Sequence, residues 1–299
     1  MKRSDTDTRP SLARGLALGM ITVFALASAA CSPGGSAAEE GPPFEFPLEE
    51  AGQDTSVQDD ALGEALSAIP GQFAATVYDR DSDRVLAAHD AERPEETQSV
   101  VKILIALDAL ERGEDPDTVN EMLSRSDDDL ASELWARGGG PAIVEAQARR
   151  MGLSETAAPD DPGRWGDTLM SAMDIVTAYE YVETAVPPEH AEVVLAALED
   201  ITDVAADGFD QRFGLAALDE GAKVKQGWAC CLPDRALNTT GIVGPDERFT
   251  VVVLGSWPEK VPYEEARVHL DAATSAALAP LEEAERTDAD PDEVSSMAP

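Results

Sequence analysis

The middle of the chain and its two flanks carry different hydrophobic patterns. Apolar residues at helical spacing fill the middle, whereas short apolar runs bounded by turn residues lie on either side of it. The runs predict two early strands, 73–78 and 84–88, and three late strands, 222–230, 236–243 and 249–256. The periodic segments predict helices over 60–69, 99–113, 119–123, 129–137, 142–151, 170–184, 189–198 and 263–281.

This order of elements predicts an α+β fold. If the early hairpin pairs with the late strands, the product is a five-stranded antiparallel sheet flanked by N- and C-terminal helices, with an all-helical lobe inserted. The terminal helices would cover one face of the sheet and the lobe the other. A ligand cleft is then expected between the sheet and the lobe.

Residues 1–30 are typical of an export signal rather than of a fold. A basic start precedes an apolar stretch that is shorter than the about 20 residues a membrane-spanning helix needs. Cys31 then follows Ala-Ser-Ala-Ala and resembles the acceptor cysteine of a bacterial lipoprotein, although Ser28 stands where such signals usually carry leucine. Ordinary cleavage after Ala29 or Ala30 is the alternative. We expect a protein on the outer face of the cell membrane as a lipoprotein, or a secreted one.

Composition sets the remaining boundaries. Residues 31–58, which begin with the lipidated cysteine, are rich in Gly, Pro, Ser, Ala and Glu and predict a flexible linker. Residues 285–299 predict a disordered acidic tail. The intervening residues 59–284 suffice for one domain with a sizeable core.

The chain is strongly acidic, with 59 acidic and 22 basic residues and a formal net charge of −37. Nucleic acid is excluded as a partner, because phosphate binding needs basic patches. An anionic membrane surface would repel the chain as well, so contact with a membrane is expected through the lipid anchor only. Against this background the few lysines are informative, because Lys102, Lys223 and Lys225 all lie in or beside the motifs that carry the candidate chemistry.

No pattern in the sequence indicates a metal site. The histidines are scattered, and no Cys/His spacing suggests zinc. Cys230 and Cys231 are adjacent, so a bridge between them would be strained, and a pair of small buried thiols is the alternative. We expect neither a metal nor another cofactor.

The most informative motif is Ser99-Val100-Val101-Lys102 at the head of an apolar helical run. Residues three apart share one face of a helix, so the lysine amine can lie beside the serine hydroxyl. The positive end of the helix dipole disfavours a charged lysine there. A neutral lysine can accept the serine proton and make the oxygen a nucleophile. The alternative is an ordinary helix start with Ser99 as its cap.

Two later motifs strengthen this interpretation. Ser126-Asp127-Asp128 follows within the helical region, and Lys225-Gln226-Gly227 lies on a predicted late strand. In order and type the three motifs resemble the S-x-x-K, S-D-N and K-T-G set of class A β-lactamases and penicillin-binding proteins. The resemblance covers roughly residues 59–284 and implies the β-lactamase and DD-peptidase fold.

The resemblance also implies roles for the motif residues. Ser99 would attack a carbonyl to form an acyl-enzyme, Lys102 would be its base, and Ser126 would pass a proton to the leaving nitrogen. The substrate-binding residues would be Asp128, Lys225, Gln226, Gly227 and Trp228, with Lys225 binding a substrate carboxylate. Backbone N–H groups of Ser99 and Trp228 would form the oxyanion hole. The alternatives are a helix cap for Ser126-Asp127 and plain edge-strand protection for Lys225.

The chain departs from the family pattern at three places. Asp128 replaces an asparagine, and its negative charge would favour a charged Lys102. Gln226 replaces a threonine hydroxyl. Residues 164–168 resemble the end of the long loop of class A β-lactamases, but the segment before them lacks that loop's glutamate. Asp160 and Asp161 are the nearby carboxylates there, so an acyl-enzyme is expected to break down slowly.

The sequence therefore predicts an exported serine hydrolase that acts by acyl-enzyme transfer on β-lactams or D-Ala-D-Ala cell-wall peptides, with weak or no true β-lactamase activity. The alternative is a catalytically inactive lipoprotein of the same fold that binds cell-wall peptides or a protein partner. Convergence of Ser99 Oγ, Lys102 Nζ and Ser126 Oγ would favour the enzyme. A tight ion pair between Asp128 and Lys102 would favour the binding protein.

Overall fold

The computed structural model describes residues 44–46, 56–230 and 234–289. Its main sheet is antiparallel throughout and has the strand order β2-β1-β7-β6-β5. The early hairpin, β1 (Gln72–Asp79) and β2 (Arg84–His89), therefore pairs with the late strands β5 (Lys223–Ala229), β6 (Asp234–Val243) and β7 (Phe249–Pro258). The predicted five-stranded α+β sheet is confirmed, and β5 is one of its edges.

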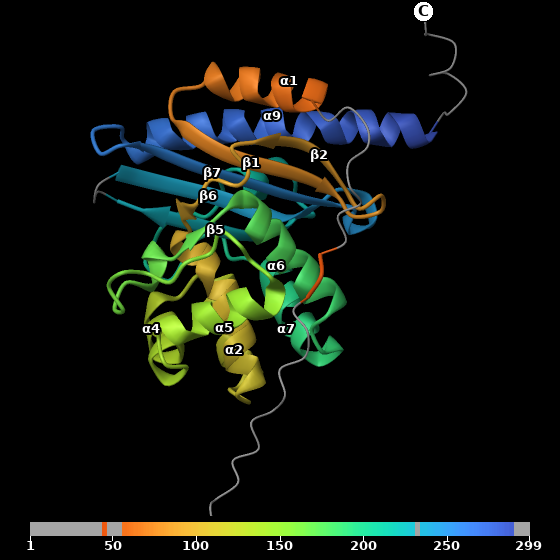
Figure 1. The fold of residues 1–299 in the computed structure, drawn as a ribbon. Coiled ribbons are helices and arrows are strands. Elements are labelled where there is room, and N and C mark those ends of the chain that lie inside the picture. The colour runs from red at the N-terminus through yellow and green to blue at the C-terminus, as the bar shows by residue number, and fades with distance from the viewer. Residues whose placement is uncertain (1–43, 47–55, 231–233, 290–299) are drawn as a thin grey trace, which may run out of the picture. The chain divides into compact units, whose positions relative to one another are not determined.

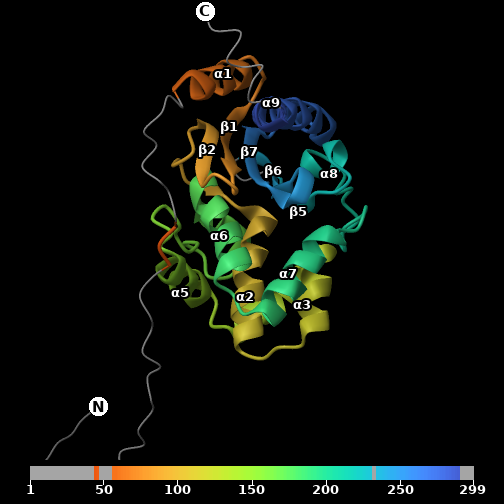
Figure 2. The same ribbon diagram turned by 90° about the vertical axis from the view of Figure 1, so that its right-hand side faces the viewer.

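Helices cover both faces of this sheet. Figure 1 shows α1 (Ser56–Ser67) and α9 (Tyr263–Ala289) side by side on one face, and the edge-on view in Figure 2 shows the helical lobe against the other. The lobe contains α2 (Lys102–Glu111), α3 (Pro116–Ser124), α4 (Asp128–Arg137), α5 (Pro141–Met151), α6 (Ala172–Thr184) and α7 (Pro188–Glu199). No described helix is both long enough and apolar enough to cross a membrane.

The alternation of side chains along the strands explains the two cores. Neighbouring residues of a strand point to opposite faces. Along β1, Ala74 and Tyr78 pack against the lobe, whereas Phe73, Ala75 and Val77 pack towards α1 and α9. Because both faces are covered, every residue of β1 after Gln72 is buried, and its apolar residues are not confined to alternate positions.

Short elements depart from the predicted pattern. The helix predicted from residue 99 begins as a 3₁₀ turn, η1 (Gln98–Val101), and a small second sheet pairs β3 (Glu95–Glu96) with β4 (Leu169–Met170). Because Leu169 and Met170 are in β4, the helix predicted from 170 starts at Ala172 instead. The other short elements are η2 (Trp165–Asp167), α8 (Leu215–Leu218) and η3 (Pro245–Glu247).

The domain also extends beyond its predicted limits. α9 continues to Ala289, past the predicted start of the tail. Its last residues are mostly polar, so no apolar period in the sequence marked them as helical. Phe44 and Phe46 lie in the predicted linker but contact the domain, with Phe44 edge-on to Tyr181 and Phe46 against Tyr78. Two aromatic side chains bury enough apolar surface to hold a short segment in place without regular structure.

Candidate active site

Ser99 lies inside the 3₁₀ turn η1 and does not cap either helix. Thr97 precedes η1 without a capping side-chain bond, and Val101 occupies the cap position of α2. The backbone N–H of Thr97 donates to Thr168 O at 2.9 Å, and Asn238 Nδ2 donates to Thr97 O at 3.2 Å. The small second sheet and β6 therefore fix the start of the turn that carries the serine.

The residue before Ser99 adopts an unusual backbone conformation. Gln98 has φ 50°, in the left-handed region that residues other than glycine rarely occupy. Such strain is found where surrounding contacts hold a functional segment in place. Gln98 Nε2 donates to Glu96 Oε2 at 2.9 Å, and this side-chain bond helps to hold the turn.

Ser99, Lys102 and Ser126 converge as the motif spacing predicted. Lys102 Nζ lies 2.9 Å from Ser99 Oγ, 3.2 Å from Ser126 Oγ and 2.9 Å from Ser126 O. All three side chains are buried, and Lys102 is 0% exposed. The amine is therefore within direct proton-transfer distance of both hydroxyl groups.

Lys225 completes a continuous polar chain across the interface between sheet and lobe. Its Nζ donates to Ser126 Oγ at 3.0 Å and to Gln226 O at 3.0 Å. The hydroxyl of Ser126 thus lies between two lysine amines. Lys225 is fully buried, so the structure places this amine beneath Ser126 and not on an open surface.

Asp128 forms the ion pair that its sequence position suggested. Its Oδ1 lies 2.6 Å from Lys102 Nζ, and 56% of its side chain is exposed while that of Lys102 is not. Asp127 has a different role, because its side chain accepts hydrogen bonds from the N–H groups of Asp129 and Leu130 and caps α4. The helix-cap alternative is therefore correct for Asp127, but Ser126 remains directed at the lysines.

Burial lowers the pKa of both lysines. It lowers the pKa of Lys102 below its ordinary value, although the negative charges of Asp128, Asp127 and Asp207 act in the opposite direction. The pKa of Lys225 is lowered further, because that amine is wholly buried and Lys102 lies nearby. The expected effect of Asp128 on Lys102 is present, but it is smaller than the effect of desolvation.

The strand residues after Lys225 have distinct environments. A Cβ on Gly227 would lie 2.7 Å from Thr97 O, so only glycine lets β5 approach η1 this closely. Gln226 is buried and donates from Nε2 to Gln211 O at 3.1 Å and to Phe213 O at 2.6 Å. Its amide therefore holds the 211–213 segment. The family resemblance implies that Gln226 contacts a substrate, as the threonine does at that position. In the structure, Gln226 does not face a substrate, because its longer side chain reaches the carbonyls of the loop.

Trp228 is partly buried and lies next to residues that the sequence motifs did not indicate. Its Nε1 donates to Asp207 Oδ2 at 3.0 Å, and its ring stacks on Phe209 with 4.8 Å between centroids. Asp207 comes from a loop distant in sequence and matches no motif, so only the fold reveals it.

Trp165 was also missed as a site residue. Its ring centroid lies 4.6 Å from Lys102 Nζ, and its Nε1 donates to Ser132 Oγ at 3.2 Å. The sequence showed this tryptophan only as part of a loop end, and its position above the amine depends on how η2 packs. In the same loop, Asp161 accepts a hydrogen bond from its own neighbour Gly163, as expected of a surface turn.

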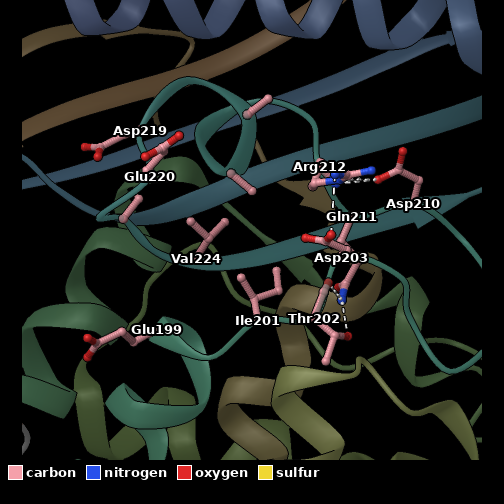
Figure 3. A pocket seen from close by; sticks show the side chains of 13 residues that line it. Glu199, Ile201, Thr202, Asp203, Asp210, Gln211, Arg212, Asp219, Glu220 and Val224 are labelled. Carbon is pink, nitrogen blue, oxygen red and sulfur yellow. Dashed lines mark hydrogen bonds and ion pairs between the residues drawn. The ribbon is translucent and has the colours of Figure 1, made fainter.

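A separate cavity of about 560 Å³ lies beside the first part of β5. Figure 3 shows Val224 at this cavity with Glu199 and Ile201 on one side and Asp219 and Glu220 on another. Ser99, Lys102, Ser126 and Lys225 do not line it. The cavity is therefore no evidence for a functional site at the serine cluster. The evidence for that site is the hydrogen-bond geometry of its residues.

Within the described segments, no group of three or more His, Cys, Asp or Glu side chains could hold a metal ion. Cys230 is disulfide-bonded, whereas Cys31 and Cys231 lie outside the described residues.

The chain resembles one group of curated proteins in sequence. It is 38% identical over 172 residues to LppW of Mycobacterium tuberculosis and of Mycobacterium bovis, which is named as a candidate lipoprotein. The match covers 52% of this chain and 54% of LppW, so the chain spans about half the length of these relatives. No protein-family profile matches the chain.

Solved structures resemble it over a larger part. A β-lactamase from Chitinophaga pinensis superposes with a TM-score of 0.62 at 15% identity, covering 75% of this chain and 98% of the other. TLA-1, an extended-spectrum β-lactamase, gives 0.64 at 12% identity over 77% and 99%. A class A β-lactamase from Bacteroides cellulosilyticus gives 0.60 at 12% identity over 77% and 98%. The chain therefore has the fold of the class A β-lactamases.

Proposed function

We propose that the protein is an acylating serine hydrolase in which Ser99 is the nucleophile. The observation that carries this proposal is the unbroken run of contacts from Ser99 Oγ through Lys102 Nζ and Ser126 Oγ to Lys225 Nζ, with distances of 2.9, 3.2 and 3.0 Å. A helix cap or a structural lysine needs only one of these contacts.

The chain of contacts supports an acylation step in which each proton has a donor and an acceptor. Neutral Lys102 takes the proton of Ser99 Oγ as that oxygen attacks a carbonyl carbon and forms a tetrahedral adduct. The lysine then returns a proton through Ser126 Oγ to the leaving nitrogen, the carbon–nitrogen bond breaks, and an ester of Ser99 remains. Lys225 holds Ser126 by its hydrogen bond, and the Ser99 and Trp228 N–H groups would bind the oxyanion.

The substrate class follows from the neighbours. The structures with this fold are named β-lactamases, and the motif order is shared with DD-peptidases, so β-lactams or D-Ala-D-Ala cell-wall peptides are the proposed substrates. The relatives' name supports an exported protein held at the membrane by lipid on Cys31. In that place the site would face cell-wall peptides.

One observation favours the second candidate, an inactive binding protein. The 2.6 Å contact between Asp128 Oδ1 and Lys102 Nζ is an ion pair, and an ion-paired ammonium is not a base. The enzyme remains the better-supported proposal because Lys102 Nζ keeps its contacts with Ser99 Oγ and Ser126 Oγ beside this ion pair.

Intact-mass spectrometry tests the proposal. The full exported chain is incubated with benzylpenicillin and with its neutral methyl ester, beside a Ser99→Ala variant as control. We expect a mass increase equal to the intact lactam on the wild type and none on Ser99→Ala. If neither lactam adds to the wild type and neither is hydrolysed, acylation is excluded for this class, and the binding protein becomes the better explanation.

A further inference from the structure

Asn238 of β6 is a buried residue whose side-chain amide binds the segment that leads into η1. It is 1% exposed. Its Nδ2 donates to Glu96 O at 3.0 Å and to Thr97 O at 3.2 Å, and its Oδ1 accepts from the Gly255 N–H at 3.3 Å. An amide turned the other way would place its oxygen against two carbonyl oxygens, so these partners fix its orientation. One side chain therefore joins β6 and β7 to the start of the turn that carries Ser99.

Asn238 reaches this segment because the residue opposite it on β5 is a glycine. Gly227 is the pairing partner of Asn238 in the register of β5 and β6. Residues that lie directly opposite each other on antiparallel strands project from the same face of the sheet. A Cβ on Gly227 would lie 2.7 Å from Thr97 O and 3.4 Å from Asn238 Cβ. The missing side chain therefore leaves room for the amide to reach the Thr97 carbonyl.

These contacts lie between the two backbone N–H groups to which the proposed function assigns the oxyanion hole. One belongs to Ser99 in η1, and the other belongs to Trp228, which directly follows the glycine opposite Asn238. The carbonyl of Thr97 accepts from the Val100 N–H at 3.1 Å as well as from Asn238. A shift of this carbonyl would therefore move the first turn of η1, and with it the Ser99 N–H, relative to β5.

We propose that Asn238 is a positioning residue for acylation. Its amide holds the Ser99 turn at the distance from β5 at which the N–H groups of Ser99 and Trp228 both reach one oxyanion. Such donors stabilise a transition state only when they are already in place before the charge develops. Asn238 touches no reacting atom and acts through Thr97. The proposal rests on the proposed function, because it requires Ser99 to be acylated.

Asn238→Leu tests the role of the amide with a side chain of similar size. The variant leaves the Glu96 carbonyl without this donor and releases the Thr97 carbonyl from β6. Acylation by benzylpenicillin is followed by intact mass at several lactam concentrations, under conditions in which circular dichroism shows the variant to be folded. We expect the maximal acylation rate to fall about tenfold or more, because removing an oxyanion donor outright costs about 10²–10³-fold. The lactam concentration at half-maximal rate should change little, since the ground-state complex does not carry the oxyanion.

Asn238→Asp adds a readout that a general loss of packing would not produce. An ionised carboxylate only accepts hydrogen bonds and would face the carbonyls of Glu96 and Thr97, whereas a protonated carboxyl donates one bond. The acylation rate of this variant relative to the wild type should therefore rise as pH falls. The carboxylates that line the same cavity as Asn238, those of Glu95, Glu96 and Asp234, are common to all variants, so the ratio cancels their titration. The ratio for Asn238→Leu, which has no titrating group there, should not depend on pH.

Thr239→Val is the matched control on the opposite face of the same strand. Thr239 is the next residue of β6 and is 0% exposed, and its Oγ1 accepts from the Leu215 N–H at 3.0 Å. The substitution keeps the shape of the side chain but also leaves a buried backbone group without its partner, which lowers stability. We expect a lower thermal midpoint and an unchanged acylation rate in the folded protein.

Failure of this proposal differs from failure of the proposed function. If the wild type is acylated at Ser99 and folded Asn238→Leu reacts at the same rate, the positioning role is overturned and the enzyme stands. An equal loss of rate in Thr239→Val would assign the effect to stability alone, and would also overturn the role. If the wild type forms no Ser99-dependent adduct, the proposed function is rejected, and the role of Asn238 in acylation is rejected with it.

Discussion

Asp128 is the residue whose effect best distinguishes the two proposed functions, an enzyme and an inactive binding protein. Its carboxylate touches the amine that has to be neutral for acylation, and it acts to keep that amine charged. Burial of Lys102 acts in the other direction. Under the proposed function, the balance between these two effects would decide at which pH the serine becomes reactive.

Asp128→Asn should therefore move the pH dependence of acylation. Only neutral Lys102 accepts the serine proton, so the rate rises as pH increases through the Lys102 pKa. Removing the carboxylate lowers that pKa further, so the rising limb moves to lower pH and acylation near pH 7 becomes faster. The measurement is the acylation rate across pH, with Asp129→Asn in the same helical turn as control. An unmoved limb would show that the ion pair does not control Lys102.

Gly227 offers a test of how closely β5 must approach η1. A Cβ there would meet the Thr97 carbonyl at 2.7 Å, and backbone atoms cannot move aside cheaply. Gly227→Ala should lower the free energy of unfolding by about 1–3 kcal/mol and reduce acylation, because overpacking displaces the strand from Ser99. Gly221→Ala, whose Cβ would lie 3.6 Å from a side-chain oxygen before the same strand, is the control for chemical denaturation. Equal stabilities of the two variants would contradict the close approach.

Which site residues could be found from the sequence depends on how local their signal is. Ser99 and Lys102 are three residues apart on one helical segment, and Ser126 and Lys225 belong to motifs of recognisable type, so their convergence could be predicted. Trp165 and Asp207 carry no spacing signal. They reach the site only through the packing of η2 and of the 201–212 loop, which a single sequence does not reveal.

At the level of elements, the loop between α5 and α6 would determine the lifetime of the acyl-enzyme that the proposed function requires. The Trp165 ring centroid in η2 lies 4.6 Å from Lys102 Nζ. Asp161 Oδ1 accepts a hydrogen bond from the Gly163 N–H. Asp167 pairs with Arg164 at the same loop. The described loop therefore directs an indole ring, not a carboxylate, towards the lysine.

We expect the acyl-enzyme to be long-lived for this reason. Ester hydrolysis needs a water molecule activated by a base, and a positioned general base typically contributes about 10²–10⁴-fold. After brief acylation and removal of free lactam by gel filtration, the adduct should persist over hours by intact mass, and multiple-turnover hydrolysis should be slow. Rapid loss of the adduct would contradict this expectation and would mean that another group, such as Lys102, activates water.

The long helices and strands were predicted better than the short ones. Continuous apolar strands and periodic helices carry their signal over many residues, so the sheet and lobe followed from the pattern. β3, β4 and η1 are two to four residues long, and β3 and β4 pair with partners distant in sequence, such as Met170 for Glu95. Their bounds therefore depend on tertiary contacts.

For the whole molecule, the dominant property is the net charge of −37 on a fold of ordinary architecture. Many surface acids have an arginine partner, for example Glu114 with Arg112 and Arg137. The 22 basic residues cannot neutralise 59 acids, however, so repulsion between unpaired carboxylates opposes the compact state. Exposed ion pairs contribute little by themselves, about 0–1 kcal/mol each.

Salt should therefore stabilise this protein. Raising NaCl from about 0.01 M to about 1 M shortens the Debye length from about 30 Å to about 3 Å, which screens the repulsion over the whole surface. The Lys102–Asp128 contact, which is only part-buried, is screened less than a fully exposed pair. The thermal midpoint should rise steadily over this range, and potassium chloride at equal ionic strength should act alike, since screening depends on charge rather than ion identity. Differential scanning calorimetry measures the midpoint, and the acylation rate with the neutral methyl ester checks that the site is unchanged. A midpoint that falls with salt would mean that the surface ion pairs contribute more to stability than the excess acids cost.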